Sequence, residues 1–158
     1  MRFLTVFSGR EGRTSGRVCA SHPGYVVRAA ALLFQRQRGL EEVEGGLPLC
    51  RRAGNAGVLP SVVLAESYAI IRRDAGREVA EHRFNELVDS GLKVVPLSPD
   101  MARESGVIRA KYHEKIPWGD CLIAGTHILE KADVILSEDP HFREIAEVKA
   151  KTLAQFKI

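Results

Sequence analysis

The sequence predicts a single α/β domain in which a mostly parallel sheet carries helices on its faces. Three observations lead to this fold class. Short runs rich in β-branched residues alternate with segments whose apolar residues recur at helical spacing, which is typical of β-α-β units. The 158 residues suit one domain with a substantial hydrophobic core. A content of 45% hydrophobic and 27% charged residues is typical of a globular, water-soluble protein.

The pattern is regular from residue 58 onward. The short β-branched stretch 58–63 runs into a helix, and Gly76 separates that helix from the next one. Ser98 is a favourable N-cap, and Pro99 suits the first turn of a helix. The expected elements are, in order, a strand near 58–63, helices over 64–73 and 77–90, a strand over 92–97, helices over 98–112 and 120–131, a strand over 132–137, a short helix over 140–145 and a strand or extended segment over 148–153.

The first 57 residues have a different character. Residues 1–7 are compatible with a strand and residues 26–37 with a helix. Residues 1–58 contain nine Arg and four Glu with no Lys or Asp, a net charge of +5, whereas residues 59–158 contain fourteen basic and sixteen acidic side chains, a net charge of −2. A basic segment can contact nucleic-acid phosphates, although an accident of composition is the preferred explanation here.

Cysteine usage and hydropathy predict a cytoplasmic protein. Cys19, Cys50 and Cys121 are odd in number and widely separated, which favours free thiols in a reducing compartment. No apolar run reaches the ~20 residues that a membrane helix needs. The apolar residues 3–7 are interrupted at once by Gly, Arg and Glu, so a signal peptide is not expected.

Three acids stand where an α/β fold places functional groups. Asp139 follows a predicted strand, and ligand sites in such folds lie beyond the carboxyl ends of the strands. Asp120 stands between a Pro-Trp-Gly turn and an apolar helix, which would place it at the rim of the sheet. Glu66 lies inside an apolar helical segment, where a carboxylate is costly unless it is paired or bound to metal. Carboxylates gathered at one sheet edge would bind a hard cation and favour metal-assisted phosphodiester chemistry.

Each acid also has a purely structural interpretation. Asp139 precedes a proline, so it can form a turn and cap the short helix that follows. Asp120 can be the N-cap of its own helix. Glu66 can lie on a narrow polar stripe together with Ser61 and Arg73. Other site types find little support, because the histidines lack a His-x-x-x-His pair for zinc, and Cys121 has no histidine placed to activate it.

Taken together, the three acids and their surroundings resemble the PIN-domain family of nucleases, especially VapC-type toxins and archaeal PIN proteins. The resemblance covers about residues 57–156. The segments that carry it are 61–68 with Glu66, 116–126 with Asp120, and 132–142 with Asp139. It implies a three-layer α/β/α fold with a mostly parallel central sheet of about five strands. It also implies that Glu66, Asp120 and Asp139 are catalytic ligands of Mg²⁺ or Mn²⁺, and that Ser137 orients a bound water or one of the ligand acids.

The chain departs from the family pattern at its start. Family members open with a strand that ends in an aspartate, whereas the first Asp here is Asp74. We therefore treat 1–158 as one PIN-like domain with an atypical segment over 1–57. Two explanations of that segment stay open, a degenerate family member and a shifted or mis-started reading frame. An unbroken frame in the resequenced gene and in close relatives would reject the second.

The function implied by the resemblance is metal-dependent cleavage of single-stranded RNA, and the missing first aspartate predicts weak metal binding and little turnover. The protein would then be an endoribonuclease and possible toxin of a toxin–antitoxin pair, with an antitoxin partner and a homodimeric state. The alternative is a catalytically inactive PIN-fold module that binds RNA or protein. Metal-independent RNA binding with a steep salt dependence would favour that alternative.

Overall fold

A computed structural model describes residues 5–9, 24–27, 55–152 and 155 of the chain. Its side chains are described from residue 57 onward. The strands in the described residues are β1 (Thr5–Gly9), β2 (Gly24–Val27), β3 (Asn55–Pro60), β4 (Lys93–Val95), β5 (Ala132–Leu136) and β6 (Ala150–Lys151). The helices are α3 (Ser61–Ala75), α4 (Arg77–Val88), α5 (Pro99–Tyr112), α6 (Trp118–Leu129) and the single turn α7 (His141–Glu144), with a 3₁₀ turn over His113–Lys115.

The strands form one sheet in the order β4-β3-β1-β2-β5-β6. Its parallel pairs are β3 with β4, β5 with β6, and β2 with both β3 and β5. β1 runs antiparallel to β2, β3 and β5. The prediction of a mostly parallel sheet is therefore confirmed, with β1 as the antiparallel exception.

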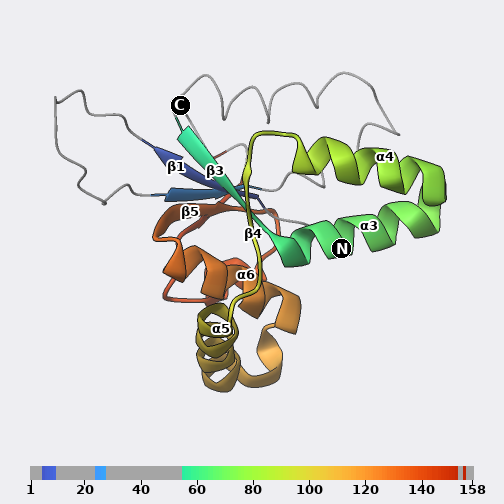
Figure 1. Ribbon diagram of the computed structural model, residues 1–158. Coiled ribbons are helices and arrows are strands. Elements are labelled where there is room, and N and C mark those ends of the chain that lie inside the picture. The colour runs from blue at the N-terminus through green and yellow to red at the C-terminus, as the bar shows by residue number, and fades with distance from the viewer. Residues whose placement is uncertain (1–4, 10–23, 28–54, 153–154, 156–158) are drawn as a thin grey trace, which may run out of the picture.

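The helices lie in two groups around the sheet (Figure 1). α6 packs against β5 and against α5, which lies on its outer side. α3 and α4 pack against each other as a helical pair that extends away from the end of β3. α6 contacts α3, β5 and α7. This arrangement places the start of α6, the first turns of α3 and the end of β5 in one region of the molecule.

Local sequence explains where the helices begin and end. Ser98 caps α5 as expected, because its hydroxyl accepts a hydrogen bond from the Met101 backbone N–H at 3.2 Å and Pro99 follows it at the first helical position. Gly76 separates α3 from α4 with φ of +86°, a left-handed conformation that glycine adopts without steric cost. The expected elements from residue 58 onward are all present, with ends that differ by a few residues.

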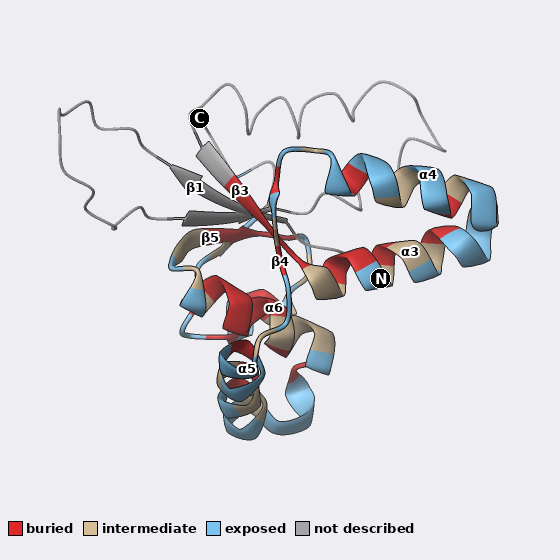
Figure 2. Ribbon diagram, viewed as in Figure 1, coloured by how far each residue is buried: buried red, intermediate tan, exposed pale blue. Residues whose placement is uncertain are grey.

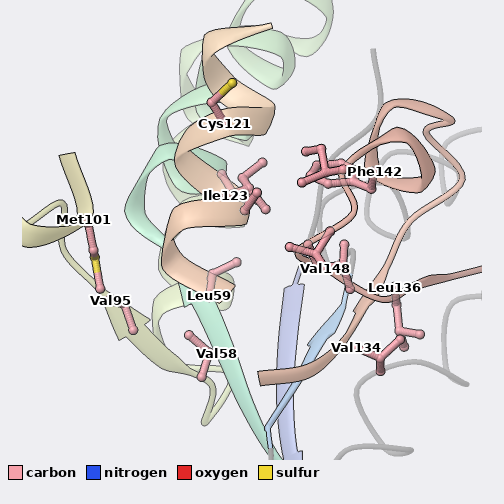
Figure 3. Packing of buried hydrophobic residues seen from close by; sticks show 14 of the residues in the cluster. Val58, Leu59, Val95, Met101, Cys121, Ile123, Val134, Leu136, Phe142 and Val148 are labelled. Carbon is pink, nitrogen blue, oxygen red and sulfur yellow. The ribbon is translucent and has the colours of Figure 1, made fainter. Parts of the chain in front are cut away.

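The hydrophobic core lies between the sheet and the helices (Figure 2). Leu59, Ile116, Cys121, Ile135 and Phe142 have no exposed surface. Side chains from β3, β5, α6 and α7 meet there, as the close view in Figure 3 shows for Leu59, Leu136, Ile123 and Phe142. Burying a large apolar side chain contributes roughly 1.5–3 kcal/mol, so this contact fixes α6, which carries Asp120, and the elements β5 and α7, which flank the turn with Asp139.

One expectation about local structure is wrong. The helix predicted over 26–37 fails at its start, because Val26 and Val27 belong to β2; the rest of that segment lies outside the described residues. β-branched residues suit a pleated strand, and here pairing with β1 and β3 outweighs the helical spacing. The strand expected over 1–7 is described only from Thr5, as β1.

Among the described residues, no helix has the length and apolarity that a membrane crossing requires.

Candidate metal centre

Asp120 stands in the first turn of α6 rather than at its N-cap. α6 begins at Trp118 after the N-cap Pro117, so Asp120 is its third residue. The N-cap interpretation is therefore wrong, although an acid in the first turn still interacts favourably with the helix dipole. Cys121 directly behind it has no exposed surface, which anchors this turn in the core. The Asp120 side chain is 14% exposed, so solvent still reaches it.

Asp139 stands in a tight turn directly after β5. The backbone N–H of Asp139 donates to the Ser137 hydroxyl at 2.9 Å, and the Asp139 carboxylate accepts from the His141 backbone N–H at 3.1 Å. These hydrogen bonds confirm the turn-forming interpretation of Asp139. They do not exclude a second role, because a carboxylate has two oxygens and further lone pairs. Ser137 is buried and acts on the shape of this turn.

The turn after β5 brings His141 against Asp120. The His141 Nδ1 atom lies 2.9 Å from Asp120 Oδ2 and 3.0 Å from Asp139 Oδ1. One ligand atom from each of these three residues lies within 4.8 Å of the other two. The acids of two different elements are thus brought together, as the sequence predicted, and an imidazole lies between them.

Glu66 approaches the same region from α3. A Cβ atom placed on Gly119 would lie 2.5 Å from Glu66 Oε1, so the Glu66 carboxylate lies directly over the backbone next to Asp120. Glu66 is half-buried, while its neighbours Val63, Leu64 and Ser67 face the core. The close group of ligand atoms consists of Asp120, Asp139 and His141, and Glu66 borders it.

The donor set suits a divalent cation. Two carboxylates and a neighbouring third one provide the oxygen ligands that Mg²⁺ and Mn²⁺ prefer, and the imidazole adds a nitrogen ligand. The ligand side chains are partly exposed, so an ion can reach them from solvent. Cys121 contributes no thiolate, because burial raises the pKa of its thiol and its Sγ contacts the Ile116 carbonyl. It behaves as a small buried hydrophobe.

Comparison with known protein families identifies the family of this chain. The family model described as PIN domain matches residues 35–148. The chain belongs to the PIN-domain family. This confirms the resemblance drawn from the three acidic segments and the α/β/α fold it implied. The matched range begins at residue 35, inside the segment that the sequence sets apart as atypical.

Solved structures with the same fold support this assignment. VapBC2 from Rickettsia felis, crystallised with a DNA fragment from its promoter, matches with a TM-score of 0.61 and 19% identity over 78% of this chain and 94% of that one. DNA-bound VapBC from Salmonella typhimurium matches with a TM-score of 0.62 and 17% identity over 78% of this chain and 93% of that one. No curated protein sequence matches this chain significantly.

His141 is the site residue that sequence reasoning missed. Sequence reasoning weighs the histidines only as zinc ligands in a His-x-x-x-His pair. The available signal was its place two residues after Asp139 in an Asp-Pro-His turn. The turn alone does not predict the contact with Asp120, which is 21 residues away in sequence.

Proposed function

We propose that this PIN-domain protein is a metal-dependent ribonuclease that cleaves phosphodiester bonds of single-stranded RNA. The observation that supports this most directly is the convergence of Asp120 and Asp139, from α6 and from the turn after β5, on one small group of ligand atoms. Isolated surface acids pair with nearby cations or remain solvated. Acids that meet across elements, with Glu66 beside them, are typical of a cation site.

The residues have distinct roles in this proposal. A divalent cation at such a site supplies Lewis acidity, which makes water a better nucleophile and offsets the charge that develops on the phosphate. Asp120 and Asp139 hold the cation, and Glu66 provides a third carboxylate at its border. Ser137 fixes the turn that carries Asp139, through the hydrogen bond that its hydroxyl accepts. Mg²⁺ or Mn²⁺ is the proposed cofactor.

The catalytic test compares the purified full chain with Asp120→Asn and Asp139→Asn. We expect cleavage of a labelled single-stranded RNA with Mn²⁺ or Mg²⁺, no cleavage with EDTA, and a rate reduced at least ~100-fold in each variant, because an amide is a poorer cation ligand than a carboxylate. Asp100→Asn is a suitable control, since Asp100 lies exposed in the first turn of α5. Cleavage that persists in both site variants would reject the assignment. RNA binding without cleavage would point instead to the inactive module.

We further propose that the protein acts as the toxin of a toxin–antitoxin pair in the cytoplasm. The two VapBC complexes that share its fold support this proposal. Expression of the wild-type chain alone should arrest growth, whereas Asp120→Asn should not. Co-expression of a small protein encoded beside the gene should restore growth, form a complex that contains a homodimer of this chain, and suppress RNA cleavage. Unrestricted growth with the soluble, cleavage-active protein would count against a toxin.

A further inference from the structure

His141 is held in place by its own turn and by the core behind it. Its backbone N–H donates to Asp139, and the next residue, Phe142, has no exposed surface. These restraints direct the imidazole toward the acids, and the side chain keeps 34% exposure. His82 is a contrasting case: it lies on α4 with a side chain 70% exposed, and its Nε2 atom lies 3.5 Å from its helical neighbour Glu86.

The separations around His141 are hydrogen-bond distances, and they also match the spacing of ligands that share one ion. Metal–ligand distances of about 2.0–2.2 Å with angles between 90° and 109° place neighbouring ligand atoms roughly 2.8–3.6 Å apart. The Nδ1 atom lies 2.9 Å from Asp120 Oδ2 and 3.0 Å from Asp139 Oδ1. All three ligand atoms lie within 4.8 Å of one another, close enough to share one cation.

We propose that His141 is a nitrogen ligand of the divalent cation, beside Asp120 and Asp139, and that it makes this site prefer Mn²⁺ and Zn²⁺ to Mg²⁺. The inference rests on the proposed metal site and specifies its donor set. Mg²⁺ is bound through oxygen ligands, whereas imidazole suits later transition metals and is accepted by Mn²⁺ more readily than by Mg²⁺. The Nδ1 lone pair would face the ion, with the ring proton on Nε2.

A different role for the same contact is a hydrogen bond that the imidazole donates to Asp120 and that is broken when an ion binds. The two roles predict opposite effects of removing the imidazole. Loss of a ligand weakens Mn²⁺ binding, whereas loss of a competing hydrogen-bond donor strengthens it.

The test measures metal binding by the full chain independently of RNA cleavage. Titration calorimetry gives affinities for Mn²⁺, Zn²⁺ and Mg²⁺, and pulsed electron paramagnetic resonance of bound Mn²⁺ detects coupling to a directly coordinated ¹⁴N nucleus. Trp118, the one tryptophan of the sequence, stands two residues before Asp120 and reports binding by fluorescence. The variants are His141→Ala, His141→Asp and the control His82→Ala, each checked for native folding by circular dichroism.

The ligand role predicts a specific pattern. Wild type and His82→Ala show the ¹⁴N coupling; His141→Ala loses it and binds Mn²⁺ at least ~10-fold more weakly, with a smaller change for Mg²⁺. His141→Asp replaces nitrogen with oxygen and shifts the preference toward Mg²⁺. Coupling that is absent in wild type or kept in His141→Ala, or tighter Mn²⁺ binding by His141→Ala, would overturn the inference.

Asp120→Asn separates this inference from the proposed function. If Asp120→Asn abolishes Mn²⁺ binding while His141→Ala has no effect, the metal site stands and the role of His141 fails. If the folded wild-type chain binds no divalent cation, or if Asp120→Asn binds as wild type does, both the metal site and the role of His141 are rejected.

Discussion

At the scale of single residues, Gly119 determines how close the Glu66 carboxylate comes to the start of α6. A Cβ at this position would lie 2.5 Å from Glu66 Oε1, a distance at which the carboxylate must move. The absence of a side chain at 119 therefore lets an acid from α3 lie beside Asp120. Sequence reasoning selected Glu66 from its apolar surroundings but attached no role to Gly119, because the two residues are 53 positions apart.

Gly119→Ala should impair cation binding without unfolding the protein. The added methyl displaces the Glu66 carboxylate, and we expect Mn²⁺ affinity to fall about 3- to 10-fold, while the preference of helices for Ala over Gly adds up to ~1 kcal/mol of stability. Calorimetric Mn²⁺ titration and urea unfolding measure the two effects. Gly106→Ala is the matched control, since a Cβ there would have nothing within 4 Å. Unchanged Mn²⁺ affinity in Gly119→Ala would argue that Glu66 takes no part in the site.

At the scale of elements, the α5–α6 contact depends on small residues. Gly125 of α6 faces Ser105 of α5, whose side chain has no exposed surface and whose hydroxyl donates to the Met101 carbonyl at 2.6 Å. A Cβ at 125 would lie 2.3 Å from Ser105 Oγ and 3.0 Å from the Ser105 backbone nitrogen. Because a backbone atom is involved, a side-chain rotation cannot relieve the contact and the helices must separate.

Gly125→Ala should therefore destabilise the protein. Overpacking of this kind costs about 1–3 kcal/mol, which outweighs the gain in helix propensity. Chemical denaturation monitored by circular dichroism gives the free energy of unfolding, with Gly106→Ala on α5 as the control that should be neutral or slightly stabilising. The double variant Gly125→Ala with Ser105→Ala should recover part of the loss, because it removes the nearest atom. A stability equal to wild type would show that the two helices adjust freely.

At the scale of the whole molecule, folding places an uncharged histidine in the interior. His127 of α6 is 5% exposed, and within the described part of the chain its Nδ1 atom has no hydrogen-bond partner. Burial lowers the pKa of His127 from 6.5 to about 4. An unfolded chain would bind a proton at pH 5, whereas the folded chain does not, so acid conditions shift the folding equilibrium.

The free energy of unfolding should fall as the pH decreases from 6.5 toward 4. The contribution of His127 is fully present above pH 6.5, and its loss reaches roughly 3 kcal/mol near pH 4, since each pKa unit corresponds to ~1.4 kcal/mol. Urea unfolding at a series of pH values measures the slope, which should be shallower in His127→Leu and unchanged in His82→Ala, an exposed histidine. Equal slopes in wild type and His127→Leu would show that His127 is solvated in the folded state.

The sequence by itself determined the succession of elements after residue 58 and the acids that merit testing. These features are local, because hydrogen bonds and side-chain packing within a few residues produce them. They are the patterns of apolar spacing, the pair Ser98 and Pro99 at a helix start, and Asp139 after a strand. Helix starts were less predictable: α6 begins two residues before Asp120, where no side chain makes a cap hydrogen bond. The sequence also carried the family resemblance that the PIN-domain match confirms.

Only the tertiary structure decided which elements are neighbours and which side chains meet. The contacts that the tertiary structure adds are between residues far apart in sequence. They account for the antiparallel direction of β1 and the strand conformation of Val26. They also bring His141 to Asp120 and Glu66 over Gly119. No local pattern encodes these contacts, since they arise when the sheet and helices pack around a common core. The chain thus specifies its candidate ligands one by one, and the packing of α3, α6 and the turn after β5 brings them to one place.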